Sequence, residues 1–228
     1  MLVILSAGIA PGLAFLSYLY LKDQYEQEPF RYVLKTFVYG MLITFPILFI
    51  QSVFEIEGIT FPLWGQAFLT AGLLEEFFKW FVLFFIVIQS INFDDPYDGI
   101  VFGASVSLGF ATAENILYLL AHGVSFAFGR ALLPVSSHAL FGVIMGYYLG
   151  KSKFSLSQNV KWVLFSLVIP IILHGTYDYI LIRNVPYWPY FMIPFMMFLW
   201  WLGLKKVKTV HLLAKGQEPY LIKKSSSF

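Results

Sequence analysis

The sequence predicts an all-α, polytopic integral membrane protein: a bundle of about seven transmembrane helices, with the N-terminus outside and the C-terminus in the cytoplasm. Its composition, its succession of apolar windows and its distribution of Lys and Arg predict this fold. Of the 228 residues, 59% are hydrophobic and only 12% are charged, whereas an ordinary soluble domain is about a quarter charged. A soluble fold of this length has too little interior to bury that much apolar surface.

Crossing a ~30 Å hydrocarbon core takes about 20 predominantly apolar residues in a helix. Seven such windows can be drawn, near residues 2–21, 34–54, 65–90, 99–121, 132–150, 160–182 and 186–204. The first window has no Lys or Arg ahead of it and is too long for a signal-peptide core, so it is interpreted as an uncleaved anchor. We expect one transmembrane domain over residues 1–204 and a basic cytoplasmic tail over 205–228.

The orientation follows from the basic residues, because cytoplasmic loops carry an excess of Lys and Arg. With the C-terminal tail inside and seven spans, only Arg130 and Arg183 face outward. The remaining basic residues face the cytoplasm, except for Lys79, which lies inside the third window. The net charge of +2 gives no indication of a nucleic-acid partner. The absence of cysteine excludes a disulfide framework.

Small residues recur every four positions in three of the windows, as Gly8/Gly12, Gly99/Gly103 and Gly142/Gly146/Gly150. This spacing places them on one face of a helix, where they allow two backbones to approach closely. We expect these faces to form helix–helix contacts and to carry no chemistry.

Ionisable residues inside the windows are the strongest indication of function, because a charge at mid-bilayer depth is costly. Counted at ~1.5 Å of rise per residue, their acids and histidines lie between about 6 and 15 Å from the outer end of their windows. Successive spans alternate in direction, so this agreement in depth predicts a single site in the outer half of the membrane. The residues are Glu75, Glu76, Lys79, Glu114, His138, His174 and Asp178.

Spacing within the helices predicts two contacts. Lys79 lies four residues after Glu75 and three after Glu76, so its ammonium can lie beside both carboxylates. Asp178 lies four residues after His174, where a carboxylate can orient an imidazole and fix its tautomer. Phe110 and Glu114 share a face in the same way, which places an aromatic wall beside a third carboxylate.

Such a cluster allows more than one chemistry. Carboxylates and imidazoles in a water-lined cavity can activate water for hydrolysis, either with a divalent metal or by general-base catalysis alone. They can also relay protons or bind a cation in an ion-coupled carrier. A non-catalytic scaffold with an inert polar core is a third alternative.

The motifs themselves resemble those of the PrsW family of bacterial intramembrane proteases. The resemblance rests on Glu75-Glu76-x-x-Lys79, Phe110-x-x-x-Glu114, Ser-His138-Ala-Leu and His174-Gly-Thr-Tyr-Asp178. It extends to Ser-Ala-Gly-Ile-Ala-Pro-Gly near the start and Lys-Asp-Gln-Tyr-Glu-Gln-Glu-Pro before the second window, and so covers nearly the whole chain.

The resemblance implies a multi-pass enzyme of the bacterial plasma membrane that makes the first, extracytoplasmic cut in a membrane-anchored anti-sigma factor. A second protease would then release the sigma factor in a stress response. The same pattern is more distantly similar to CAAX-processing and bacteriocin-processing membrane proteases. Glu114 departs from that wider group, which has histidine at the matching position.

The sequence therefore predicts a peptidase whose catalytic residues are Glu75, Glu76, Glu114, His138, His174 and Asp178. One glutamate of the 75/76 pair activates water and the other supports it, while His174, oriented by Asp178, stabilises the oxyanion or binds metal. Imidazole and carboxylate donors suit Zn²⁺, with His138, His174 and Glu76 as its candidate ligands. A metal-free glutamate mechanism stays open beside it. The expected partners are a single-span anti-sigma factor and the lipid bilayer.

Overall fold

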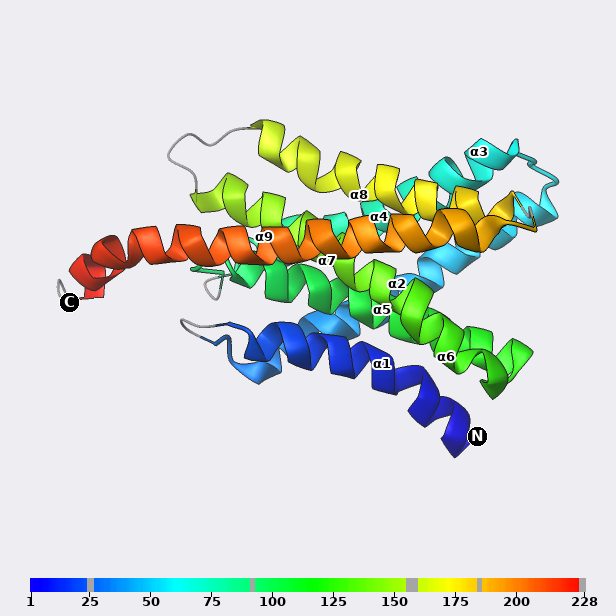
Figure 1. The fold of residues 1–228 in the computed structure, drawn as a ribbon, viewed down its shortest axis with the longest axis horizontal. Coiled ribbons are helices and arrows are strands. Elements are labelled where there is room, and N and C mark those ends of the chain that lie inside the picture. The colour runs from blue at the N-terminus through cyan, green and yellow to red at the C-terminus, as the bar shows by residue number, and fades with distance from the viewer. Residues whose placement is uncertain (24–26, 91–92, 155–159, 184–185, 226–228) are drawn as a thin grey trace.

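The structure, a computed structural model, describes residues 1–23, 27–90, 93–154, 160–183 and 186–225, with side chains as far as His211. Among these residues all regular secondary structure is helical, and it forms seven continuous helical runs. The predicted all-α bundle is confirmed. In Figure 1 the N-terminus, α3 and α6 lie at the right-hand end of the bundle and the C-terminus at the left-hand end.

The seven runs correspond to the seven apolar windows. Five of them are single helices: α1 (Leu2–Leu21), α2 (Phe30–Ile56), α5 (Asp98–His122), α8 (Val160–Ile182) and α9 (Trp188–Ser225). The third run joins α3 (Leu63–Gly65), η1 (Gln66–Leu73), α4 (Leu74–Val82) and η2 (Leu83–Val87). The fifth joins η3 (Val124–Phe126), α6 (Ala127–Arg130), η4 (Ala131–Val135) and α7 (Ser136–Phe154).

Five runs are long and apolar enough to cross a membrane among the residues that the structure describes: Leu2–Leu21, Phe30–Ile56, Asp98–His122, Val124–Phe154 and Val160–Ile182. The third run carries Glu75, Glu76 and Lys79 within two turns, which lowers its hydropathy. The chain is therefore a polytopic membrane protein. Its third run differs from these five in carrying three charged residues in the middle of an apolar segment.

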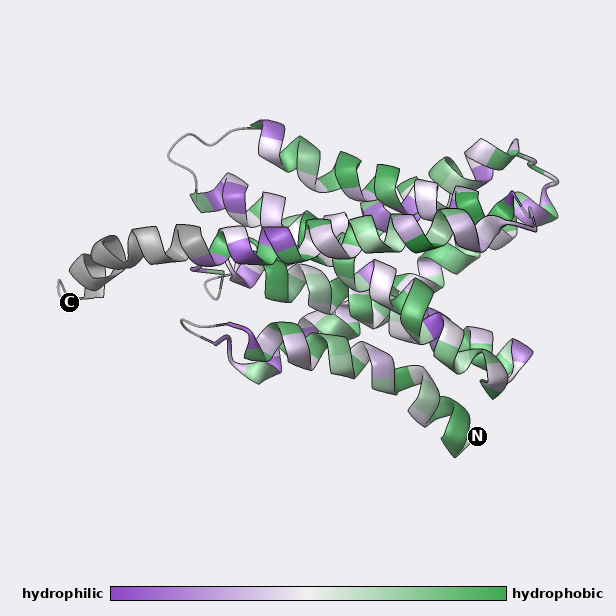
Figure 2. Cartoon of the chain, viewed as in Figure 1, coloured by the Kyte–Doolittle hydropathy of each residue, from purple (hydrophilic) through white to green (hydrophobic). Residues whose placement is uncertain are grey.

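The outer faces of the helices are apolar, as lipid contact requires. Large hydrophobic side chains such as Phe45, Phe49 and Met197 are exposed, whereas Glu76 and Lys79 are fully buried. Figure 2 shows hydrophobic residues along much of α8 and at the start of α1, with hydrophilic residues gathered at the helix ends on the left. The apolar outer faces thus enclose the buried charges of Glu76 and Lys79, while other hydrophilic residues lie at the helix ends.

Helix α5 is the central element, and its glycines set the distance to its neighbours. A Cβ added at Gly103 would collide with the backbone carbonyl of Gly142, and one at Gly146 with that of Gly99. Gly109 faces the carbonyl of Phe37 on α2 in the same way. The predicted glycine faces thus pack α5 against α7, and a further pair packs it against α2.

Two π-helical segments directly precede the polar residues of their runs. Segment η1 ends one residue before α4, which carries Glu75 and Glu76, and η4 ends just before α7, which carries His138. Pro134 lies inside η4 and cannot donate a backbone hydrogen bond. Such local widening is common at functional sites and changes the direction in which the following side chains point.

The fifth and seventh runs extend beyond their predicted windows. Gly123, with a φ of 96°, turns the chain at the end of α5, and the fifth run begins directly after it at Val124. Helix α9 continues past residue 204 to Ser225. The division at that residue into a transmembrane domain and a basic cytoplasmic tail stays a prediction.

The contact between α5 and α7 generates a prediction. Replacing Gly146 with Leu should lower the free energy of unfolding by about 1–3 kcal/mol or more, because a side chain has no space against the backbone of Gly99. Thermal unfolding in detergent measures the effect. Gly129→Leu is the matched control, since nothing lies within 4 Å of an added Cβ there. Equal stability of both variants would contradict the packing described above.

Candidate active site

Helix α4 supplies a cation flanked by two carboxylates. The Nζ atom of Lys79 donates to Oε1 of Glu76 at 2.8 Å and lies 3.5 Å from Oε2 of Glu75. It also sits over the ring of Phe110 from α5, 4.1 Å from the centroid. Lys79 is fully buried, so its charge is balanced by these groups rather than by water. The contact predicted from the spacing is therefore present with both glutamates.

Helix α8 brings His174 against the same pair. Its Nδ1 atom lies 2.9 Å from Oε1 of Glu76, and because a carboxylate only accepts, Nδ1 carries the proton. Its Nε2 atom lies 3.2 Å from Oδ2 of Asp178 and 3.8 Å from Oε2 of Glu75. The predicted pairing of His174 with Asp178 is present, and Glu76 orients the other side of the ring.

Helices α7 and α5 complete the cluster through His138 and Glu114. The ammonium of Lys79 lies 3.1 Å from Nδ1 of His138, which therefore accepts. On the other side of the ring, Nε2 lies 3.4 Å from Oε2 of Glu114. The rings of Phe110 and Phe141 pack around His138. His138 thus connects Lys79 to the carboxylate of Glu114.

Arg130 and Asn115 also belong to the network, and the sequence-based prediction did not include them. An Nη2 atom of Arg130 lies 3.4 Å from Oε1 of Glu114, and its Nε donates to Oδ1 of Asn115 at 2.9 Å. Asn115 in turn donates to the backbone oxygen of Gly8 on α1 at 3.1 Å. The sequence offered one indication of this contact: Arg130 lies in a short outer segment that contains no acidic residue to pair with it.

The six predicted site residues therefore form one chain of contacts, running from Arg130 through Glu114, His138, Lys79, Glu76 and His174 to Asp178, with Glu75 beside Lys79 and His174. The exposed fraction of the side chains falls from both ends of the network toward its middle. The side chain of Glu114 is 34% exposed and that of Asp178 20%, compared with 11% for Glu75 and 0% for Glu76. Water reaches the network from the side of Glu114 and Asp178.

One part of the network has the donors of a metal site. One oxygen of Glu75 and one nitrogen each of His138 and His174 lie within 4.8 Å of one another, and all three residues are buried. Two imidazoles and a carboxylate are a common ligand set of catalytic zinc sites. His174 also has the second contact that ligating histidines usually have, from Nδ1 to a carboxylate. The residues present thus fit a divalent metal.

The position of Glu76 differs from that of a ligand. The sequence suggested Glu76 as the carboxylate partner of the two histidines, whereas the structure groups Glu75 with them. Oxygen Oε1 of Glu76 accepts from Lys79 and His174, while its Oε2 is buried with no hydrogen-bond partner among the described residues. Both ring nitrogens of His138 and of His174 have partners, so metal binding would displace one contact at each ring, at His174 the contact of Nε2 with Asp178.

The formal charges of the network also favour a divalent cation. With both imidazoles neutral, as metal binding requires, the four carboxylates Glu75, Glu76, Glu114 and Asp178 exceed the two cations Lys79 and Arg130 by two negative charges. An excess of negative charge in a buried region is costly unless it is paired. One divalent ion would balance it.

Comparisons with known proteins agree with this geometry. Residues 28–202 match the PrsW family, described as intramembrane metalloproteases. The chain is 58% identical to Protease PrsW of Bacillus subtilis over 209 residues, which is 91% of this chain and 95% of the relative. Protease PrsW of Geobacillus kaustophilus is 55% identical, covering 95% of this chain and 96% of its own, and that of Clostridioides difficile 30%, covering 88% of each. No solved structure matches the chain significantly.

These matches confirm the resemblance drawn from the motifs and set aside the ion-coupled carrier. They cover the whole network, from Glu75 in the third run to Asp178 in the sixth. The protein is a peptidase and a multi-pass membrane protein. The chain belongs to the PrsW family of intramembrane metalloproteases found in bacteria.

Proposed function

We propose that this protease makes the first, extracytoplasmic-side cut in a single-span anti-sigma factor, which leads to release of a stress-response sigma factor. The proposal takes its substrate class from the motifs shared with the family. The observation that carries it is the position of the buried network. Glu114, His174 and Asp178 lie in the halves of α5 and α8 that end where the N-terminus and α6 are found (Figure 1), and the other residues lie near the middle of their runs. The distribution of Lys and Arg assigns these ends to the outside.

The two neighbouring glutamates have different tasks in this proposal. Glu75, His138 and His174 would hold a zinc ion, which would supply a Lewis acid that polarises the peptide carbonyl and acidifies water. Glu76 lies beside this group but is held by Lys79 and His174 through one oxygen only. Its second oxygen, Oε2, is a buried acceptor without a partner in the described part of the chain, and a buried unsatisfied acceptor is unusual unless it has a task.

Glu76 is therefore the proton acceptor. Its Oε2 takes a proton from the attacking water while the water oxygen forms a bond to the carbonyl carbon of the substrate. The carbon–nitrogen bond then breaks, and the same proton passes from Glu76 to the leaving nitrogen. The products are a new carboxylic acid and a new amine, which ionise to a carboxylate and an ammonium as the acid proton passes to the amine. Lys79 keeps Glu76 in place during both transfers. Glu76 fixes the orientation of His174 through Nδ1, so Nε2, which contacts Asp178 in this structure, is the nitrogen that would face the metal.

The test of the function uses the purified protein in lipid with a single-span anti-sigma factor as substrate. We expect one cut on the outer side of the substrate's transmembrane helix, found by mass spectrometry of the two fragments. An intact substrate after prolonged incubation with zinc-loaded protein would overturn the proposed substrate class. A cut on the cytoplasmic side would overturn the proposed orientation.

The division of tasks predicts different defects for the two glutamates. Glu76→Gln should lower the cleavage rate by about 10²–10⁴-fold, because an amide cannot accept the proton, yet should still bind one zinc per chain. Glu75→Gln should lower zinc affinity at least about tenfold as well as activity, since a ligand is lost. Zinc content by atomic emission and cleavage rates check both. Loss of zinc from Glu76→Gln but not from Glu75→Gln would reverse the assignment.

Metal removal gives a separate prediction. Dialysis against a strong chelator should abolish cleavage, and added Zn²⁺ should restore it, because two of the three donors are imidazoles. Added Mg²⁺ should not restore cleavage, since Mg²⁺ prefers oxygen ligands. Full activity of the metal-free protein, verified by metal analysis, would show that glutamate chemistry alone is sufficient.

A further inference from the structure

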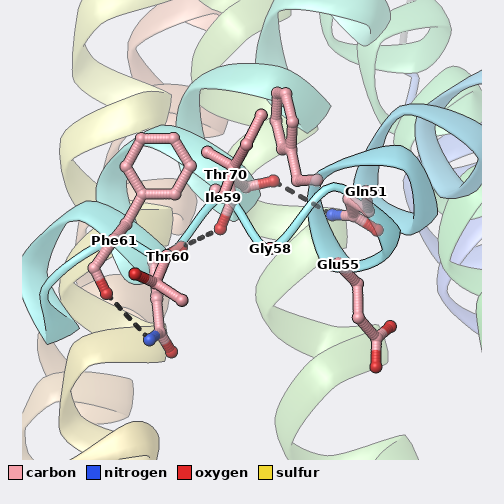
Figure 3. A pocket seen from close by; sticks show the side chains of 9 residues that line it. Gln51, Glu55, Gly58, Ile59, Thr60, Phe61 and Thr70 are labelled. Atoms are coloured by element: carbon pink, nitrogen blue, oxygen red, sulfur yellow. Dashed lines mark hydrogen bonds between the residues drawn. The ribbon is translucent and has the colours of Figure 1, made fainter.

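A polar cavity lies at the outer end of the bundle, separate from the Glu/His network. It has a volume of about 450 Å³ and lies between the end of α2 and the start of the third run. None of its lining residues belongs to the network; they are Gln51, Phe54, Glu55, Gly58, Ile59, Thr60, Phe61, Gln66 and Thr70. Figure 3 shows Glu55 extending from the last turn of α2 and Thr60 and Phe61 on the facing segment. We call this cavity the outer pocket.

The outer pocket offers several free hydrogen-bond acceptors. Gln51 donates its side-chain N–H to the backbone oxygen of Thr70 at 3.0 Å, and Gln66 donates likewise to that of Phe61 at 3.0 Å (Figure 3). The hydroxyl of Thr70 is also committed as a donor, to the backbone oxygen of Gln66. Each glutamine thus keeps its amide oxygen as an acceptor and one N–H as a donor. A ligand with several N–H donors would match this pocket.

The charge of the outer pocket is negative. Glu55 is exposed and forms no ion pair among the described residues, and the last turn of α2 contains no basic residue. The C-terminal end of a helix carries partial negative charge from its unpaired carbonyl groups, so a carboxylate there is unfavourable without a cation. A positively charged ligand bound beside Glu55 would therefore stabilise its carboxylate.

The outer pocket also lies at a defined distance from the network. Thr70 and Gln66 precede Glu75 in the same helical run by five and nine residues, which corresponds to about 7 to 14 Å along the axis. An extended peptide spans about 3.3 Å per residue. A substrate with its scissile bond at the network would thus reach the outer pocket with a residue about two to four positions farther out.

We propose that the outer pocket binds a lysine or arginine side chain of the substrate, about two to four residues to the outer side of the scissile bond. Glu55 pairs with the charge, and the amide oxygens of Gln51 and Gln66 accept from the remaining N–H groups. This assignment rests on the proposed function for the outward direction of the substrate chain. It makes the outer pocket the element that sets where the protease cuts.

The first experiment compares cleavage of a single-span anti-sigma factor that carries Arg or Gln at one position, moved along the outer segment. For the unmodified protein we expect kcat/KM to favour Arg over Gln about three- to tenfold at the matching position, mainly through KM. In Glu55→Gln this ratio should fall toward one. Glu57→Gln, which alters the same helix end outside the pocket, should keep the ratio of the unmodified protein. An unchanged ratio in Glu55→Gln would overturn the inference.

A second experiment reads binding without cleavage. Because the chain contains no cysteine, Thr60→Cys in the inactive Glu76→Gln background creates a single thiol at the outer pocket. Substrates with one cysteine should form a disulfide with it most efficiently next to the basic residue, and Glu55→Gln should lower the yield. Cleavage by the unmodified protein without any such disulfide would overturn the pocket assignment alone. Disulfide formation with no cleavage would overturn the proposed function alone.

Discussion

The buried ammonium of Lys79 is the interaction on which the rest of the site depends. It contacts Glu75, Glu76 and His138, side chains from two different helices, and lies against Phe110 from a third. Two adjacent carboxylates without a cation would be too costly to bury in a bundle that is otherwise apolar. Lys79 therefore makes it possible to keep a pair of carboxylates deep in the membrane domain, and it fixes the ring orientation of His138 at the same time.

The close packing of α5 and α7 gives this charge arrangement its geometry. Gly99 and Gly103 meet Gly142 and Gly146 backbone to backbone, so the two helices approach nearer than larger side chains would permit. His138 and Glu114 lie at the outer continuation of the same contact and can touch directly. The glycines carry no chemistry, yet the distance between these two side chains is a consequence of them.

Much of this could be predicted from the sequence, and what could not has a physical reason. The depth of a residue follows from helical rise alone, so Glu114, His138 and His174 were expected together before their helices were placed. The contacts of Lys79 with Glu75 and Glu76 follow from spacing on one helix. The grouping of Glu75 rather than Glu76 with the histidines depends on the rotation of the third run, and a π-helical segment shifts that rotation in a way that no simple period encodes.

An intramembrane protease has to admit water to one place and exclude it from the next. In the network, side-chain exposure decreases from the half-buried Glu114 and Asp178 at its two ends to Glu76 and Lys79, which are fully buried between them. Arg130 lies at the exposed end and ties Glu114 to Asn115 and, through it, to α1. Because Arg130 and Asn115 tie Glu114 to α1 and Lys79 holds the buried middle of the network together, water can enter at the exposed ends without separating the charged groups from one another.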